Sequence, residues 1–338
     1  MKHLLSCWQH SCKPLVYYSL FIAIFTLTKT HGFLRSTFPA GFKTNNIVTS
    51  PTSIFSSQEL EDSEKVQNES RKNTKDVLNL DSIRGSLIRQ EETIIFAMIE
   101  RAQFSLNPDM YNLKDYDLVP EDPAMEHKQR KGSFLEFMLC ETEKLHSRVR
   151  RYKSPEEYPF FPSFISEPIL PSLDFPSLLY DHSVNMNQAI LNSYTDLVLP
   201  RICPPGDDEQ HGSSALADIA ALQALSKRVH YGLFVAESKY QEKTEEYTRL
   251  CKENNPKGVY DLLTNKVVEE HVLKRAHLKA STYGQDISGN TNEYKVRPSV
   301  IAGLYQHVII PLTKEVEVLY LFERTGCPPP DLRNIHEE

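Results

Sequence analysis

Residues 222–241 read LQALSKRVHYGLFVAESKYQ, and they lie within a longer helical pattern that covers residues 214–241. Arg228 and Lys239 are eleven residues apart, which is three helical turns, so both lie on one face of the predicted helix. A lone cation on a helix is usually a solvated surface residue. Spacing alone therefore leaves two interpretations open: a solvent-exposed helix face, or one wall of an anion-binding site.

Two other segments carry polar residues that a plain helical bundle would not need on an inner face. Residues 309–321 read IIPLTKEVEVLYL, in which Thr313 and Glu317 are neighbours four positions apart on a helix. Residues 80–92 read LDSIRGSLIRQEE and put Arg84 in the first turn of another helix. These side chains and the two cations above are candidates for a single site.

The rest of the body also favours helix. Glycine is scarce, at 12 residues, and Leu/Ile/Glu/Lys-rich segments recur. We predict one helix from an N-cap at Asp81 to about Phe104, and a second over residues 132–152. Prolines between residues 155 and 176 force an extended connection. Further helices are predicted over residues 184–200, 214–241, 243–253, 256–263, 266–283 and 297–324. The expected fold class is all-α, a single-domain helical bundle over residues 76–325 with a flexible tail over 326–338.

Charge is distributed unevenly along the 338 residues. Residues 76–338 hold 29 basic and 40 acidic residues, a net charge of −11. Nucleic-acid binding needs a basic footprint, so this acidic body argues against nucleic acid as a partner. If the ligand is an anion, its site must be a local island of positive charge.

Signals for other chemistries are absent from the sequence. It contains no Gly-rich phosphate loop, no G-x-S-x-G elbow and no zinc-ligand spacing. The six cysteines form no C-x-x-C pair, and the four in the body are too sparse for a disulfide framework. We interpret them as free thiols in a reducing compartment and expect no metal site.

The first 75 residues are predicted to be a targeting leader and a disordered linker. Residues 15–28, LVYYSLFIAIFTLT, have the length of a signal-peptide core and are too short for a comfortable membrane span. Residues 30–37 are rich in hydroxyl side chains and free of acid, as in a transit peptide. The two in series resemble the bipartite leader of algae with secondary plastids. We expect plastid localisation and no membrane segment in the mature form, with a simple plant-type leader or secretion as alternatives.

Several long motifs resemble the plant and fungal chorismate mutases in order and spacing. They are LDSIRGSLIRQEETIIFAMIERAQF, KGSFLEFM, EKLHSRVRRYKSPEEYPFFP, LQALSKRVHYGLFVAESKYQ and IIPLTKEVEVLYL. The resemblance covers about 250 residues. It implies the all-helical mutase fold, a homodimer, and conversion of chorismate to prephenate on the route to Phe and Tyr, without a cofactor.

Carried over position by position, the resemblance implies a set of seven active-site residues: Arg84, Arg228, Lys239, Asn265, Glu269, Thr313 and Glu317. All seven have the residue type that the fungal pattern expects. Leu233 stands where relatives usually carry Lys, at a position to which we assign no catalytic role.

The chemistry of the reaction fits these residue types. Chorismate is a dianion, and guanidinium forks such as Arg84 and Arg228 suit its carboxylates. Lys239 and a protonated Glu317 would donate to the ether oxygen, where negative charge grows as the C–O bond breaks. Glu269 would accept from the ring hydroxyl, with Asn265 and Thr313 as neutral orienting groups. Apolar neighbours and a dianionic substrate should both raise the pKa of Glu317.

A second site is also implied by the resemblance. Gly212 and Ser213 before one helix, with Arg150 and Arg151 on another, resemble the family's effector site for aromatic amino acids (Trp, Tyr, Phe) at the dimer interface. The alternative is an ordinary helix start, where Gly and Ser are common.

Three other functions stay open at this stage. The chain could be a secreted mutase, for which the leader is decisive, or an inactive regulatory homologue, against which the intact Arg84, Arg228, Lys239 and Glu317 argue. A general helical scaffold is the third, but it would not explain cations on an inner face.

Overall fold

The computed structural model describes residues 78–112, 114–118, 130–173, 177–285, 293–333 and 335. These belong to the compact unit Glu61–Glu338, and the predicted leader and linker over residues 1–75 lie outside them. No helix in the described ranges has both the length and the apolar character needed to cross a bilayer.

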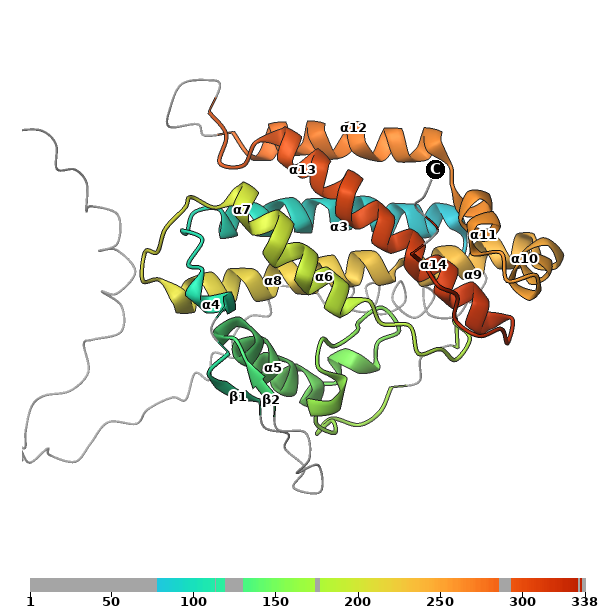
Figure 1. Cartoon of the computed structure of the whole chain (residues 1–338), viewed down its shortest axis with the longest axis horizontal. Helices are drawn as coiled ribbons and strands as arrows, with labels where there is room; N and C mark the ends of the chain where they lie inside the picture. The colour runs from blue at the N-terminus through green and yellow to red at the C-terminus, as the bar shows by residue number, and fades with distance from the viewer. Residues whose placement is uncertain are drawn as a thin grey trace, which may run out of the picture. The chain divides into compact units, whose positions relative to one another are not determined.

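Long helices dominate this unit, which confirms the predicted all-α class (Figure 1). Helix α3 (Leu80–Arg101) lies between α12 (Lys266–Tyr283) and α8 (His211–His230), and it contacts both. Helix α9 (Gly232–Glu242) continues from α8, and α14 (Ile310–Arg324) crosses the pair diagonally and packs on both.

Shorter elements complete the bundle. They are α4 (Asp109–Asn112), α5 (Phe134–Arg148), α6 (Asn187–Ser193), α7 (Leu199–Ile202), α10 (Thr244–Lys252), α11 (Pro256–Leu263) and α13 (Pro298–Leu304), with 3-10 turns at Arg151–Lys153 and Pro162–Phe164. Two π-helical turns, Tyr194–Val198 and Tyr305–Ile309, join α6 to α7 and α13 to α14. The predicted helices over 184–200 and 297–324 are therefore real but interrupted.

Helix starts show how local sequence positions the elements. Asn79 caps α3, since its side chain accepts from the backbone N–H of Asp81 at 2.9 Å, so the predicted N-cap at Asp81 is wrong by two residues. Ser133 caps α5 in a capping box with Glu136. Asn265 caps α12 by accepting from the N–H of Val268 at 3.2 Å.

A small antiparallel hairpin was not predicted. Strand β1 (Tyr116–Leu118) pairs with β2 (Arg130–Gly132), with Asp117 opposite Lys131. Each strand has only three residues, too few for alternation to show in the sequence.

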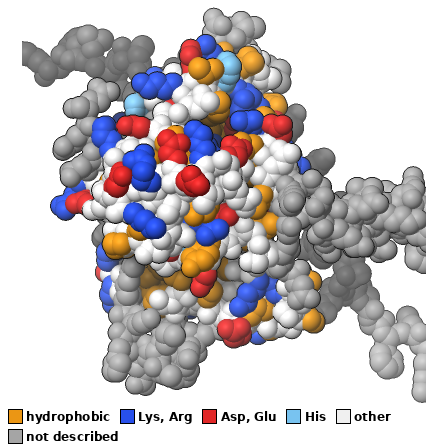
Figure 2. All heavy atoms as spheres, turned by 90° about the vertical axis from the view of Figure 1, so that its right-hand side faces the viewer, with side chains coloured by type: hydrophobic (Ala, Val, Ile, Leu, Met, Phe, Trp, Pro, Cys, Tyr) orange, Lys and Arg blue, Asp and Glu red, His pale blue; other side chains and the backbone are white. Residues whose placement is uncertain are grey.

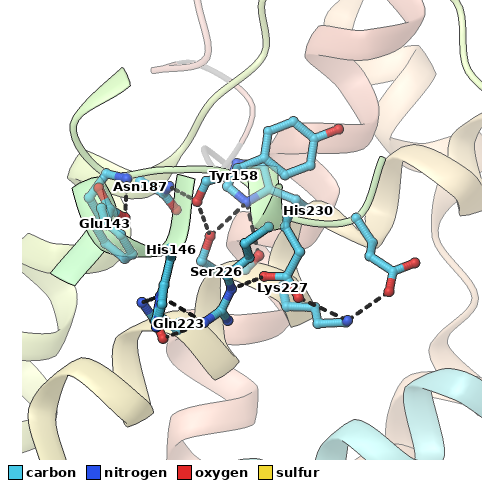
Figure 3. Close-up of polar contacts among 12 residues, drawn as sticks. Glu143, His146, Tyr158, Asn187, Gln223, Ser226, Lys227 and His230 are labelled. Atoms are coloured by element: carbon cyan, nitrogen blue, oxygen red, sulfur yellow. Dashed lines mark hydrogen bonds and ion pairs between the residues drawn. The ribbon is translucent and has the colours of Figure 1, made fainter. Parts of the chain in front are cut away.

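The proline-rich connection is extended, as predicted, except for its short 3-10 turns, and polar contacts fix it to the bundle (Figure 3). The Glu143 carboxylate on α5 accepts from the backbone N–H groups of Phe160 and Phe161 at 2.8 and 2.9 Å. The Tyr158 ring stacks on His230 of α8, with 4.4 Å between ring centroids. These contacts cover one side of α8 and leave another side for α3 and α14.

The C-terminal segment and the distribution of surface charge also bear on the predictions. Part of the segment predicted as a flexible tail packs on the body, because Ile335 is only 2% exposed. Figure 2, seen from the right-hand side of Figure 1, shows Lys/Arg and Asp/Glu side chains interspersed over much of that face. The face in view carries no broad basic area of the kind that nucleic acid needs.

Candidate active site

One cavity, of about 190 Å³, lies between α3, α8, α9, α12 and α14. All seven residues proposed from the sequence line it: Arg84, Arg228, Lys239, Asn265, Glu269, Thr313 and Glu317. The remaining lining is mostly apolar and includes Ile83, Leu87, Val235, Val272 and Ile310. The fold thus gathers polar groups from distant segments in a largely apolar enclosure.

Arg228 is the most unusual of these side chains. It is buried, and its Nη1 donates to the Thr313 hydroxyl at 3.5 Å. Among the described residues, its Nε has no hydrogen-bond partner and no carboxylate forms an ion pair with it. Burial lowers the pKa of Arg228 below its usual value. A buried guanidinium without a carboxylate is costly unless an anion joins it, so this group is poised for an anionic ligand.

Lys239 and Glu317 form a pair on the neighbouring wall. Lys239 Nζ donates to the Leu263 carbonyl at 2.8 Å and to Glu317 Oε2 at 3.2 Å. Burial raises the pKa of Glu317 above its ordinary value, although Lys239 and then Lys314 and Arg228 oppose the rise. This is the direction predicted from the sequence, and desolvation is its main cause. A proton held on this carboxyl group would make it a hydrogen-bond donor.

A third wall is formed by the start of α12. Glu269 pairs with Lys314 Nζ at 2.6 Å. Lys314 also donates to the Thr264 hydroxyl at 3.0 Å and lies 4.6 Å from the centre of the Tyr260 ring. Asn265 uses its side-chain oxygen as the α12 cap, so it is fixed in place at the cavity wall.

Lys314 is the lining residue that the sequence reasoning missed. It follows Thr313 directly and stands three positions before Glu317, a helical spacing that could have indicated a shared face. Its side chain is only 10% exposed, which a lysine between Thr and Glu gave no reason to expect.

Arg84 lies at the rim. Its side chain is 53% exposed, and Nη1 contacts the still more exposed Asp81 at 2.9 Å. This surface pair is weak, so Arg84 is free to exchange it for a ligand carboxylate.

The segment that contains Arg228 and Lys239 is not one helix over 214–241. It divides at Tyr231 into α8 and α9, although Tyr231 itself keeps helical dihedral angles. Because the chain direction barely changes, Arg228 and Lys239 still line the same cavity. A Cβ at Gly232 would lie 2.9 Å from the Thr313 carbonyl oxygen, so this glycine allows α9 to approach α14 closely.

The four residues expected to form an effector site are not brought together within one chain. Gly212 and Ser213 lie inside the first turn of α8, whose N-cap is Gln210, and not before it. The Arg151 guanidinium donates to the Gln223 side chain at 2.9 Å. Gln223 lies three helical turns beyond Gly212 on α8, a rise of about 16 Å along the helix axis. Arg150 adopts a left-handed conformation (φ 70°) and donates to the Pro171 carbonyl.

The described residues also include His, Cys, Asp and Glu side chains that could in principle bind a metal ion. Within the described ranges, no group of three or more His, Cys, Asp or Glu residues could hold a metal ion. Cys140, Cys203, Cys251 and Cys327 are free thiols, and burial raises the pKa of Cys203 and of Cys251 to about 11.

Comparison with known proteins places this cavity in context. The family model described as chorismate mutase type II matches residues 212–318. Chorismate mutase 3, chloroplastic, of Arabidopsis thaliana is 47% identical over 255 residues, which cover 73% of this chain and 78% of that protein.

Solved structures are similar as well. Aro7p chorismate mutase from Candida albicans, in complex with L-Trp, superposes with a TM-score of 0.69 at 41% identity, covering 76% of this chain and 95% of that one. AtCM1, solved with tyrosine and separately with phenylalanine in its allosteric site, gives a TM-score of 0.63 at 42% identity, covering 75% of this chain and 98% of that one.

Proposed function

The chain belongs to the eukaryotic chorismate mutase family, and on that premise we propose that its Arg228–Glu317 cavity binds chorismate and rearranges it to prephenate. The observation that carries this assignment is the buried Arg228 guanidinium, which lacks a carboxylate partner among the described residues. A dianionic substrate would supply that partner.

The proposed roles follow from position in the cavity. Arg228 and Arg84 bind the two carboxylates, one from the buried end and one from the rim. Their separation would hold the flexible enolpyruvyl arm over the ring in the reactive conformer. The rearrangement is unimolecular: one C–O bond breaks, one C–C bond forms, and no atom enters or leaves.

Lys239 and Glu317 act on the ether oxygen. Negative charge accumulates there as the C–O bond breaks, and two donors in an apolar enclosure stabilise it more strongly than water does. The 3.2 Å contact between the two side chains supports a common target. Glu269, which pairs with Lys314, accepts from the ring hydroxyl, while Asn265 and Thr313 orient the substrate.

A direct test is the loss of chorismate absorbance on adding the purified chain, with prephenate identified as the product. Turnover without added metal or cofactor is expected. An inert protein would instead support the inactive regulatory homologue.

Regulation by aromatic amino acids is proposed for the site that pairs Arg150 and Arg151 of one copy with Gly212 and Ser213 of another. The Arg150 Nε is buried and lacks a hydrogen-bond partner, which supports a ligand there. Relatives solved with Trp, Tyr or Phe give the ligand class.

A homodimer would bring these residues together. Leu145 on α5, Val149 directly after α5 and Leu216 on α8 are 65%, 50% and 69% exposed, which supports an apolar contact between copies. The expected mass in solution is that of two chains.

Gly212 offers a clean test of the effector site. It lies in the first turn of α8, where proline is tolerated, and nothing lies within 4 Å of a Cβ placed there. Gly212→Pro should blunt the response to Trp or Tyr and leave the basal rate intact. An unchanged response would remove the effector assignment.

Plastid localisation is proposed for the full chain. Several similar plant enzymes are described as chloroplastic, and the leader composition is consistent with import. A fluorescent fusion of residues 1–75 should enter a plastid, whereas export to the medium would favour the secreted alternative.

A further inference from the structure

A second positively charged hollow lies away from the residues of the catalytic cavity. It has a volume of about 630 Å³ and is lined by residues 197–201 on one side and 297–308 on the other. We refer to it as the 201/297 groove, after its two arginines. Its floor is apolar, formed by Val198, Val300, Leu304 and Val308.

The charges at this groove have one sign. Arg201, Arg297 and His307 line it, and none of its lining residues is acidic. The Arg201 guanidinium donates to the backbone carbonyl of Leu197, and the Arg297 side chain makes no hydrogen bond or ion pair with the described residues.

Most other arginines in the described ranges behave differently. Carboxylates pair with Arg84, Arg101, Arg151, Arg249, Arg275, Arg324 and Arg333. In a body with an excess of acidic residues, carboxylate partners are plentiful. Arg201 and Arg297 thus share one hollow and lack carboxylate partners among the described residues, and both are exposed, whereas Arg228 is buried.

The walls of the groove carry a second unusual feature. Both π-helical turns found in the described part of the chain contribute to it, Leu197 and Val198 from the first and His307 and Val308 from the second. Such turns are rare in proteins and occur frequently at functional sites. Residues of both π turns thus line the same groove.

From these observations we propose that the 201/297 groove binds a small organic dianion with an apolar body. The two guanidinium groups take the charged head, a phosphate monoester or a pair of carboxylates, and the valine and leucine floor takes the body. This site shares no lining residue with the catalytic cavity.

Calorimetric titration of the full chain with phenyl phosphate tests the proposal, with phthalate as the dicarboxylate arm. The Arg228→Ala variant serves as the host, so that binding in the catalytic cavity is weakened. Phenyl phosphate or phthalate should bind more tightly than inorganic phosphate, which lacks the apolar body. The stronger of the two identifies the preferred head group.

Adding Arg201→Gln and Arg297→Gln to this host should weaken binding by about tenfold or more, because charge-assisted hydrogen bonds are lost. Arg249→Gln, on α10 and outside the groove, is the matched control and should change nothing. Unchanged affinity in the double-glutamine protein overturns the proposal. A change in the oligomeric mass of the double-glutamine protein would also overturn the proposal, because it would identify the groove as a contact between copies.

Discussion

At the scale of single residues, the proposed reaction requires a protonated Glu317. The carboxyl group is buried, and its raised pKa means that the proton is retained to higher pH than in water. The bound dianion should raise this pKa further. The rate should therefore be highest in mildly acidic solution and fall as pH rises through the pKa of Glu317.

Replacement of the carboxyl group tests this mechanism. Glu317→Gln supplies an amide donor at every pH, so it should flatten the alkaline limb and retain substantial activity. Glu317→Ala should be poor across the whole range. The pH profiles of kcat/KM decide the matter, and a wild-type profile in the glutamine variant would exclude Glu317 as the titrating donor.

Lys314 is expected to position Glu269. Lys314→Met removes a buried charge-assisted contact of roughly 1.5–3 kcal/mol, so kcat/KM should fall about tenfold or more. Lys314→Arg should restore part of the loss. Lys274→Met is a matched control on α12, because the Lys274–Glu270 pair is exposed at 69% and 64%. Equal kcat/KM in the two methionine variants would remove Lys314 from the site.

Most of the polar residues that line the cavity could be predicted from the sequence, but Lys314 could not. Resemblance located seven side chains that one cavity gathers, and five of them lie in the long motifs, whereas Asn265 and Glu269 lie outside those motifs. Lys314 was missed because lysine is usually exposed, and its burial depends on Glu269 and Tyr260 from other helices. The N-cap shifted from Asp81 to Asn79 because both residue types can cap, and only the backbone conformation distinguishes them.

At the scale of elements, the close contact between α9 and α14 supports the site. A Cβ at Gly232 would lie 3.0 Å from Thr313 Cγ2 as well as 2.9 Å from its carbonyl oxygen. Gly232→Ala should therefore lower the free energy of unfolding by about 1–3 kcal/mol and reduce activity by displacing Thr313.

Gly85 on α3 provides the control, since nothing lies within 4 Å of a Cβ placed there. Gly85→Ala should stabilise the protein by roughly 0.5–1 kcal/mol, as alanine favours helix. Chemical denaturation measures both variants. If Gly232→Ala were as stable as Gly85→Ala, the close approach of α9 and α14 would be wrong.

Glu143 ties the proline-rich connection to α5 and should make stability depend on pH. Burial raises its pKa to about 7, whereas the unfolded chain titrates near the ordinary value of 4.5. Its contribution to stability is thus full below about pH 4.5 and is lost as pH rises through about 7. A shift of this size corresponds to roughly 3–4 kcal/mol.

Glu143→Gln should lack that dependence. The free energy of unfolding of both proteins can be measured from pH 4.5 to 8. As the pH rises, the wild type should lose that amount of stability relative to the variant. Parallel curves for the two proteins would contradict a raised pKa at Glu143.

Element boundaries were predictable only where they depend on local signals. Pro256–Leu263 and Lys266–Tyr283 match the predicted ranges because Asn255 and Asn265 cap them. The division at Tyr231 escaped prediction because a single glycine is tolerated within a helix, and the division serves a contact with Thr313, remote in sequence. The π-helical turns have no comparable sequence signal.

At the scale of the whole molecule, an acidic body encloses a cationic cavity. The central claim is that Arg228 is kept buried and without a carboxylate partner in order to bind substrate, at a cost to stability. Function and stability should therefore respond to its removal in opposite ways.

The most direct measurement compares Arg228→Ala with the control Arg249→Ala, by chorismate turnover and thermal unfolding of each. We expect kcat/KM of Arg228→Ala to fall by about a hundredfold or more, through loss of charge-assisted contacts to a carboxylate, with Tm unchanged or higher. Arg249→Ala, which loses only an exposed pair, should keep normal turnover. Near-normal turnover of Arg228→Ala would contradict the assignment of this cavity as the active site.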